Sequence, residues 1–139
     1  MNSASPILLA QNAPESELLL EDALRRAALA NPVIVVRDSD QTIAYLKGES
    51  PFSDRQQFPE CRILMLDLSL PRNGGWDVLR WVRSQAEFDE LLVVVLTSQT
   101  RSQDWEHAYE LGANSFLTQP YRVEDLAQLA AAFSKSWFH

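Results

Sequence analysis

The run Leu91-Leu92-Val93-Val94-Val95-Leu96 is apolar at every position. A β-strand of this composition has no face suited to water, so both faces must be covered, as they are inside a parallel sheet. Elsewhere in the chain, short strand-like runs alternate with longer stretches of helical apolar periodicity. The other expected strands are residues 7–10, 33–36, 63–67 and 115–118, and the expected helices are residues 16–30, 40–47, 76–84, 101–111 and 123–137. Strict alternation with right-handed crossovers predicts a doubly wound α/β domain with a five-stranded parallel sheet.

Length and composition limit the class of protein to which the chain can belong. With 139 residues the chain is predicted to form one domain over residues 6–139, after a disordered tail at residues 1–5. The formal charge of −7 disfavours a nucleic-acid partner, because phosphate binding needs clustered Lys and Arg. No segment approaches the ~20 apolar residues of a membrane span. No signal peptide is visible, and the single cysteine, Cys61, excludes an intramolecular disulfide, so the sequence predicts a cytoplasmic protein without a membrane partner.

Polar side chains follow the predicted strands at their carboxyl ends, where doubly wound sheets gather their functional groups. Asp67 ends the third strand and is the candidate reactive carboxylate. The ends of the other strands carry neutral groups, namely Gln11, Asn12, Thr97, Ser98 and Gln119. No Gly-x-Gly-x-x-Gly follows the first strand, which disfavours a dinucleotide site. Residues 11–15 also lack the glycine- and hydroxyl-rich loop that a flavin phosphate needs.

Three segments carry a recognisable pattern in order along the chain. They are Met65-Leu66-Asp67-Leu68-Ser69-Leu70-Pro71 with Gly75, then Val94-Val95-Leu96-Thr97-Ser98, then Tyr109-Glu110-Leu111-Gly112-Ala113-Asn114-Ser115-Phe116-Leu117-Thr118-Gln119-Pro120. This pattern resembles the CheY-like receiver domain of bacterial two-component response regulators, from about residue 6 to the C-terminus. It looks closest to small stand-alone receivers, which include partners of phytochrome-type histidine kinases.

The resemblance implies a fold and a chemistry. The fold is a flavodoxin-like, doubly wound, five-stranded parallel sheet with strand order 2-1-3-4-5. In the phosphorelay of this family, a phosphoryl group moves from a kinase histidine onto the aspartate that Asp67 matches. The family uses Mg²⁺, two acidic residues after the first strand, a Thr or Ser after the fourth, and a Lys before Pro. Positioning and charge neutralisation by these groups are the main source of catalysis in phosphoryl transfer.

The chain departs from that set at three charged positions. Gln11 and Asn12 stand at the acidic, metal-binding positions, and Gln119 stands at the lysine position. Asp67 is left as the only certain metal ligand, so any Mg²⁺ site is expected to be weak and no cofactor is expected to be required. We expect the three amides to form a neutral hydrogen-bond network with Asp67.

The phosphate-site hydroxyls and the switch position are retained. Thr97 and Ser98 match the hydroxyl positions after the fourth strand, where they either contact a phosphoryl oxygen or cap the loop. Phe116 matches the aromatic switch of the family, and packing in the core is the alternative role for it.

The favoured hypothesis is a degenerate stand-alone receiver that acts through protein–protein interaction and is not an enzyme, with no residues left for an output domain. One alternative is a working phosphoacceptor that takes phosphate from a partner histidine kinase. A second is a small phosphatase with Asp67 as nucleophile, which is disfavoured because its signature is Asp-x-Asp after the first strand.

Partner surfaces are predicted from exposed aromatic residues and from the family. A homodimer is expected through the fourth helix, the fifth strand and the fifth helix. Trp105 is expected to pack in the core, whereas Trp137 and Phe138 are expected to contribute to a partner surface, since Trp is a common interface anchor. Residues 48–60 are expected to form a polar loop that is long for a compact domain.

Overall fold

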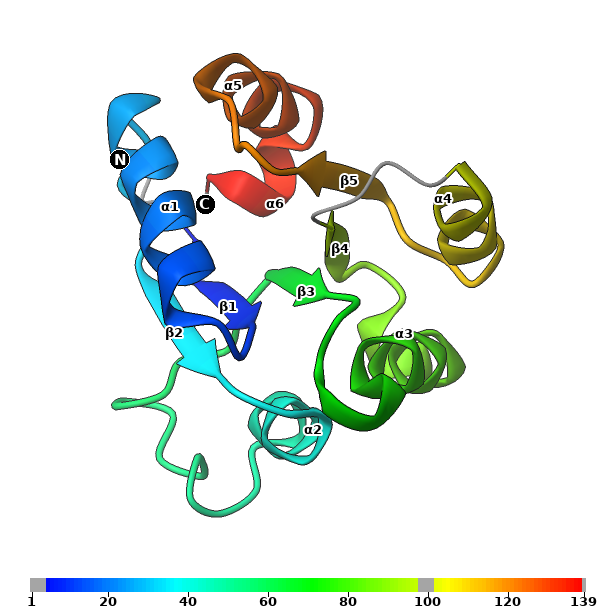
Figure 1. The fold of residues 1–139 in the computed structure, drawn as a ribbon. Helices are drawn as coiled ribbons and strands as arrows, with labels where there is room; N and C mark the ends of the chain where they lie inside the picture. The colour runs from blue at the N-terminus through cyan, green and yellow to red at the C-terminus, as the bar shows by residue number, and fades with distance from the viewer. Residues whose placement is uncertain (1–4, 98–101, 139) are drawn as a thin grey trace.

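Five parallel strands form one sheet in the order β2-β1-β3-β4-β5, which confirms the predicted flavodoxin-like fold (Figure 1). The structure, a computed structural model, describes residues 5–97 and 102–138. The strands are β1 (Ile7–Ala10), β2 (Val33–Val36), β3 (Ile63–Asp67), β4 (Leu92–Thr97) and β5 (Ser115–Thr118). The helices are α1 (Pro14–Arg26), α2 (Ser39–Lys47), α3 (Gly74–Ser84), α4 (Ser102–Glu110), α5 (Val123–Ala132) and α6 (Ser134–Trp137), with short 3-10 turns η1 (Pro71–Asn73) and η2 (Ala86–Phe88).

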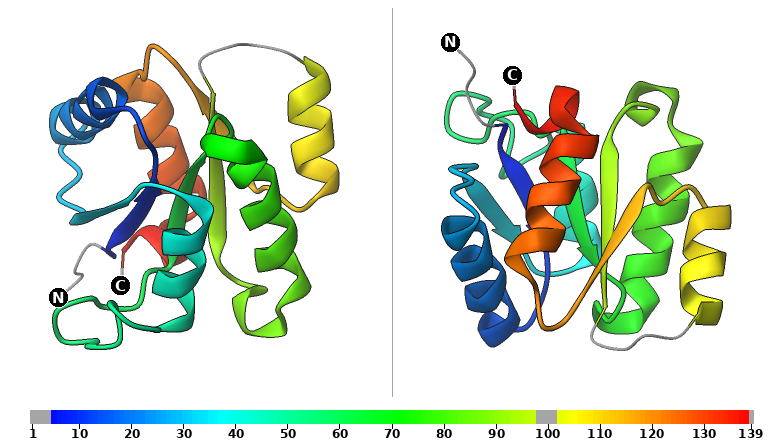
Figure 2. Two further views of the ribbon diagram at one scale, coloured as in Figure 1. Left: turned by 60° about the horizontal axis from the view of Figure 1, so that its bottom comes forward. Right: turned by 90° about the horizontal axis from the view of Figure 1, so that it is seen from above.

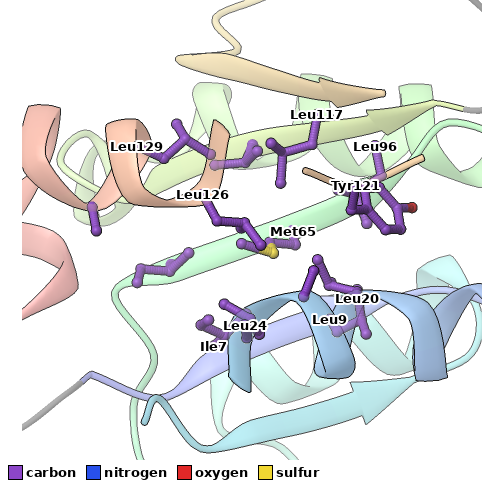
Figure 3. Packing of buried hydrophobic residues seen from close by; sticks show 14 of the residues in the cluster. Ile7, Leu9, Leu20, Leu24, Met65, Leu96, Leu117, Tyr121, Leu126 and Leu129 are labelled. Atoms are coloured by element: carbon purple, nitrogen blue, oxygen red, sulfur yellow. The ribbon is translucent and has the colours of Figure 1, made fainter. Parts of the chain in front are cut away.

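The sheet separates two apolar clusters, because successive side chains of a strand point to opposite faces. Ile7 and Leu9 face α1, α5 and α6, where Figure 3 shows them with Met65, Leu126 and their neighbours. Leu8 and the other alternate residues face α2, α3 and α4. Figure 2 shows the sheet lying between these two helical layers. Every residue of β1, and all of β3 except its last residue, is buried, as expected for central parallel strands.

The predicted helix and strand limits differ from the observed ones by a few residues. Helix α1 begins at Pro14, because Pro is tolerated in the first turn, where its missing N–H has no helical partner. It ends at Arg26, and Ala28 then takes φ +59°. None of the described helices is both long enough and apolar enough to cross a bilayer.

The C-terminal prediction is wrong in two respects. The expected single helix over residues 123–137 is interrupted at Phe133, whose φ of −121° lies outside the helical range, so α6 is a separate turn. Trp137 is fully buried and is not part of an open partner surface, whereas Phe138 is exposed. The indole Nε1 of Trp137 donates to Asn31 Oδ1 at 2.6 Å, and Asn31 Nδ2 donates to the carbonyl oxygens of Ser5 and Trp137. This bonding ties α6 to the start of β1.

Side-chain contacts hold the loop at residues 48–60 against the end of α2, which its polar composition did not indicate. Phe52 and Phe58 pack on Tyr45 of α2, with ring centroids 5.1 and 6.2 Å from the Tyr45 ring. Arg55 donates to the carbonyl oxygens of Tyr45 and Phe58 at 3.0 and 3.1 Å. Its side chain therefore joins the loop to the end of α2.

Candidate functional site

Asp67 lies at the carboxyl end of β3, in the centre of the sheet edge. It is held close to α3, because a Cβ built on Gly75 would lie 2.5 Å from the Asp67 carbonyl oxygen and 2.8 Å from Leu68 Cα. Only glycine allows this approach of helix to loop. The retained Gly75 therefore positions the loop that carries Asp67.

Both carboxylate oxygens of Asp67 accept hydrogen bonds from protein donors. Asp67 Oδ1 accepts from the backbone N–H and the hydroxyl of Ser69, at 2.8 and 2.6 Å. Asp67 Oδ2 accepts from Nε2 of Gln11 at 3.3 Å. Gln11 is buried, with 1% of its surface exposed, so this donor is part of the fixed interior. The carboxylate is therefore satisfied without a cation.

The expected amide network is present only in part. Gln11 contacts Asp67 as expected, but Gln119 Nε2 donates to Ser16 Oγ of α1 at 2.7 Å and to the hydroxyl oxygen of Tyr121 at 3.5 Å. Asn12 is exposed beside the site. The side chain at the family's lysine position thus bonds to α1 and Tyr121 instead of Asp67.

Tyr121 is a site residue that the sequence reasoning missed. It is buried just after β5, and burial raises the pKa of its phenol, with a smaller contribution in the same direction from the charge of Asp67. The hydrogen bond with Gln119 lowers that pKa in part. The signal available in the sequence was its position two residues after Gln119, which itself follows the fifth strand at the functional edge of the sheet.

Arg37 is a second residue that sequence reasoning did not single out. It follows β2, and its Nη1 donates to Glu17 Oε2 of α1 at 2.8 Å and to the Gln11 carbonyl oxygen at 3.4 Å. A guanidinium cation therefore lies next to the position where the family places its metal-binding acids. The signal was its place at the carboxyl end of a strand, the edge where functional groups gather.

The remaining predicted positions lie along the same edge. Thr97 ends β4 beside Thr118 of β5, and Ser98 lies outside the described residues. Phe116 is half-buried, with the Trp105 ring stacked on it at 5.5 Å and the Tyr109 ring edge-on at 4.6 Å between centroids. Trp105, which was expected to pack in the core, is half-buried and stacks on Phe116 instead of joining either apolar cluster.

The residues at the edge do not fit a Mg²⁺ ion. Mg²⁺ prefers oxygen ligands with charge, usually one or two carboxylates with waters. Both oxygens of the Asp67 carboxylate are hydrogen-bonded, and Gln11 turns its N–H₂ group, not its oxygen, toward it. Within residues 5–97 and 102–138, no three His, Cys, Asp or Glu side chains come together as a metal cluster.

The chain matches the family described as response regulator receiver domain over residues 7–131. It is 26% identical to response regulator Rcp1 of Synechocystis over 136 residues, which cover 98% of this chain and 90% of that protein. The bacteriophytochrome response regulator AtBRR is 30% identical with a TM-score of 0.82, over 97% of this chain and 96% of AtBRR. The phosphorylated cyanobacterial phytochrome response regulator RcpA is 26% identical with a TM-score of 0.76, over 97% and 94% of the two chains. The chain is thus a member of the response regulator receiver family of two-component signalling.

Proposed function

We propose that the protein is a stand-alone receiver that signals by protein–protein contact, without depending on phosphorylation of Asp67. The observation that carries this proposal is the bonding of Asp67, whose two oxygens are satisfied by Ser69 and by the neutral amide of Gln11. Phosphoryl transfer to a carboxylate depends on cations that neutralise the transferred group. Here those positions carry Gln11, Asn12 and Gln119.

A working phosphoacceptor is the second candidate function. Asp67 is in the right place at the end of β3 and is half-buried rather than enclosed. RcpA, a relative at similar length, is described in its phosphorylated form, and Rcp1 in a Mn²⁺-bound form with a TM-score of 0.72. In this chain the same transfer would have to proceed with a single carboxylate and no lysine, which disfavours it.

The outer face of α1 is the proposed partner surface. Leu18 and Leu19 are 65% and 54% exposed there, two and three positions after Ser16, which accepts the hydrogen bond of Gln119. Adjacent exposed leucines on a helix are suited to helix-to-helix docking. A sensor histidine kinase of the phytochrome type is the proposed partner, on the basis of the phytochrome response regulators among the relatives.

A homodimer through α4, β5 and α5 is a further proposal. Tyr109 on α4 is 54% exposed and packs its ring edge-on against Phe116 of β5. An exposed tyrosine anchored on an edge strand is a typical interface residue. Tyr109→Ser should weaken self-association in sedimentation-velocity measurements, and an unchanged distribution would count against this surface.

Phosphorylation can be tested directly by intact mass. The protein is incubated with Mg²⁺ and acetyl phosphate beside the variant Gln11→Asp/Asn12→Asp/Gln119→Lys, which restores the three charges. The proposal predicts no added phosphate on the natural chain and an added phosphate on the restored variant. A stoichiometric gain on the natural chain, lost in Asp67→Asn, would establish the second candidate function instead.

A further inference from the structure

The outer edge of β2 carries backbone groups that no other described strand pairs with. β2 ends the sheet, and β1 is its one neighbour among the described strands (Figure 1). The carbonyl oxygens of Pro32 and Val36 accept hydrogen bonds from N–H groups of the β1 segment, at 2.8 and 3.0 Å. Backbone groups alternate between the two sides of a strand, so the N–H and C=O groups of Val33 and Val35 point away from β1. These groups can pair with an added strand.

The outer edge of β2 is short and apolar. Val33, Ile34 and Val35 are all β-branched and half-buried, so their side chains are partly open as well. Edge strands of this composition are templates for pairing with another strand. Pro32, which has no N–H, precedes these residues, and Arg37 follows β2. Proline and charge at the two ends limit pairing to one short strand, which fits a discrete complex and not an extended aggregate.

A groove between α1 and β2, beside this edge, carries charges of both signs. The residues that line it include Glu21, Leu24, Arg25, Ala28 and Val33. Glu21 is half-buried and has no hydrogen bond or ion pair within residues 5–97 and 102–138. The Arg25 side chain is 80% exposed, and its pair with Asp22 of the same helix is open to water, where such a pair stabilises little. A partly buried carboxylate without a partner indicates a cation that comes from outside the chain.

Glu21 and Arg25 lie one helical turn apart and therefore at different levels along β2. Helix α1 leads from the end of β1 back to the start of β2, and the two strands are parallel, so α1 and β2 run in opposite directions. Arg25 lines the groove together with Val33, near the start of β2. Four helical residues span about 6 Å and two strand residues about 7 Å, which places Glu21 level with Val35.

We propose that β2 pairs antiparallel with β2 of a second copy of the chain, about a two-fold axis at Ile34. Val33 then faces Val35 of the second copy, and each such pair exchanges two N–H···O bonds. The same axis exchanges the levels of Val33 and Val35, so Glu21 of each copy meets Arg25 of the other. The surface complements itself in backbone pairing and in charge, as a two-fold interface requires. The pairing does not involve Asp67, so it goes beyond the proposed function and stands apart from it.

Disulfide trapping in the full chain tests the register of this pairing. The two Ile34 residues would form a non-hydrogen-bonded pair with Cα atoms about 4.5 Å apart, a distance that a disulfide can span. Ile34→Cys is made in a Cys61→Ala, Tyr109→Ser background, which removes the natural thiol and weakens association through α4, β5 and α5. Oxidation with copper phenanthroline should give a covalent dimer in several-fold higher yield than for Arg80→Cys, an exposed position on α3. Equal yields for the two cysteines would overturn the second copy as the occupant of this edge.

Charge reversal tests the contact between the two α1 helices, in the Tyr109→Ser background. Glu21→Arg alone, or Arg25→Glu alone, brings like charges together twice in each dimer, so the dissociation constant from sedimentation equilibrium should rise at least about tenfold. Combining the two substitutions should restore the affinity, and Arg80→Glu should leave it unchanged. Circular dichroism of each variant confirms the fold. A double variant as weak as the single ones, or single variants that associate like their parent, would overturn the proposal.

Discussion

The Gln11 amide donates to the Asp67 carboxylate across the ends of β1 and β3, with 3.3 Å between Gln11 Nε2 and Asp67 Oδ2. In the family that the chain belongs to, Gln11 occupies the position of an acid that would share a metal ion with this carboxylate. Under the proposed function, this amide–carboxylate hydrogen bond takes the place of that shared ion. The hydrogen bonds that the two Asp67 oxygens accept come from neutral groups, and the fold around the site is that of the family.

Asn31→Ala should destabilise the fold by about 2–3 kcal/mol, because it leaves the buried Trp137 indole N–H without an acceptor and two carbonyl oxygens without their shared donor. Urea denaturation monitored by circular dichroism measures the loss. Asn12→Ala, at an exposed asparagine, should change stability by less than about 0.5 kcal/mol. Equal effects of the two substitutions would show that the bonding to α6 contributes nothing.

Arg83→Met should cost about 2–3 kcal/mol, because the Arg83 guanidinium donates at 2.8 Å to the carbonyl oxygens of Phe88, Leu91 and Gly112 and to Asn114 Oδ1. These bonds join α3 to the loops before β4 and β5. Arg80→Met is the matched control, since Arg80 is exposed and pairs only with Asp77 among the described contacts. It should change stability by less than about 0.5 kcal/mol. Equal melting temperatures of Arg83→Met and Arg80→Met would refute the role of Arg83 in joining α3 to these loops.

Gly75→Ala should destabilise the protein by about 1–3 kcal/mol through overpacking against the Asp67 carbonyl and Leu68. Gly74→Ala should be much milder, because its nearest neighbour would be the Ser39 side chain at 3.2 Å and its φ of −62° is helical. Chemical denaturation of both variants tests the contrast. A milder effect at Gly75 than at Gly74 would contradict the close approach of α3 to the loop.

Burial raises the pKa of Cys61 from 9.0 to about 11, and the hydrogen bond with Tyr45 and the charge of Arg55 offset part of that rise. Because the pKa of the thiol is higher in the folded state than in the unfolded state, its contribution to stability is fully present below pH 9. This stabilisation is lost as pH rises toward 11, since the unfolded thiol loses its proton first. Stability should therefore decline between pH 9 and 11, and the decline should be smaller in Cys61→Ala. An identical pH profile for that variant would contradict the assignment.

Much of the fold could be predicted because its signals are local. The apolar run at residues 91–96 and the alternation around it determine the sheet, and β4 is displaced by only one residue. No Gly or Pro marks the break at Phe133, so the apolar pattern predicted one continuous helix through it. Trp137 was misassigned because its burial depends on Asn31, 106 positions away, and no local pattern contains that contact.

The positions of the main site residues could be predicted, but not all of their contacts. The carboxyl ends of the strands located Asp67, Gln11 and Gln119 correctly at one edge. Gln119 bonds to Ser16 because α1 and the end of β5 meet there, a contact across 103 positions that depends on packing. Tyr121 was missed because an aromatic after a strand is normally core, and only the structure places its hydroxyl beside Gln119.

The most direct test of a phosphate-independent site is a titration with Mg²⁺ and beryllofluoride, a mimic of the phosphoryl group on a carboxylate. Amide NMR signals of Asp67 and Ser69 report on it, since the Ser69 N–H donates to the carboxylate that the mimic would occupy. The account predicts no saturable change in either signal for the natural chain, and a clear change for the variant with Gln11→Asp, Asn12→Asp and Gln119→Lys. A saturable shift of both signals in the natural chain, absent in Asp67→Asn, would contradict it.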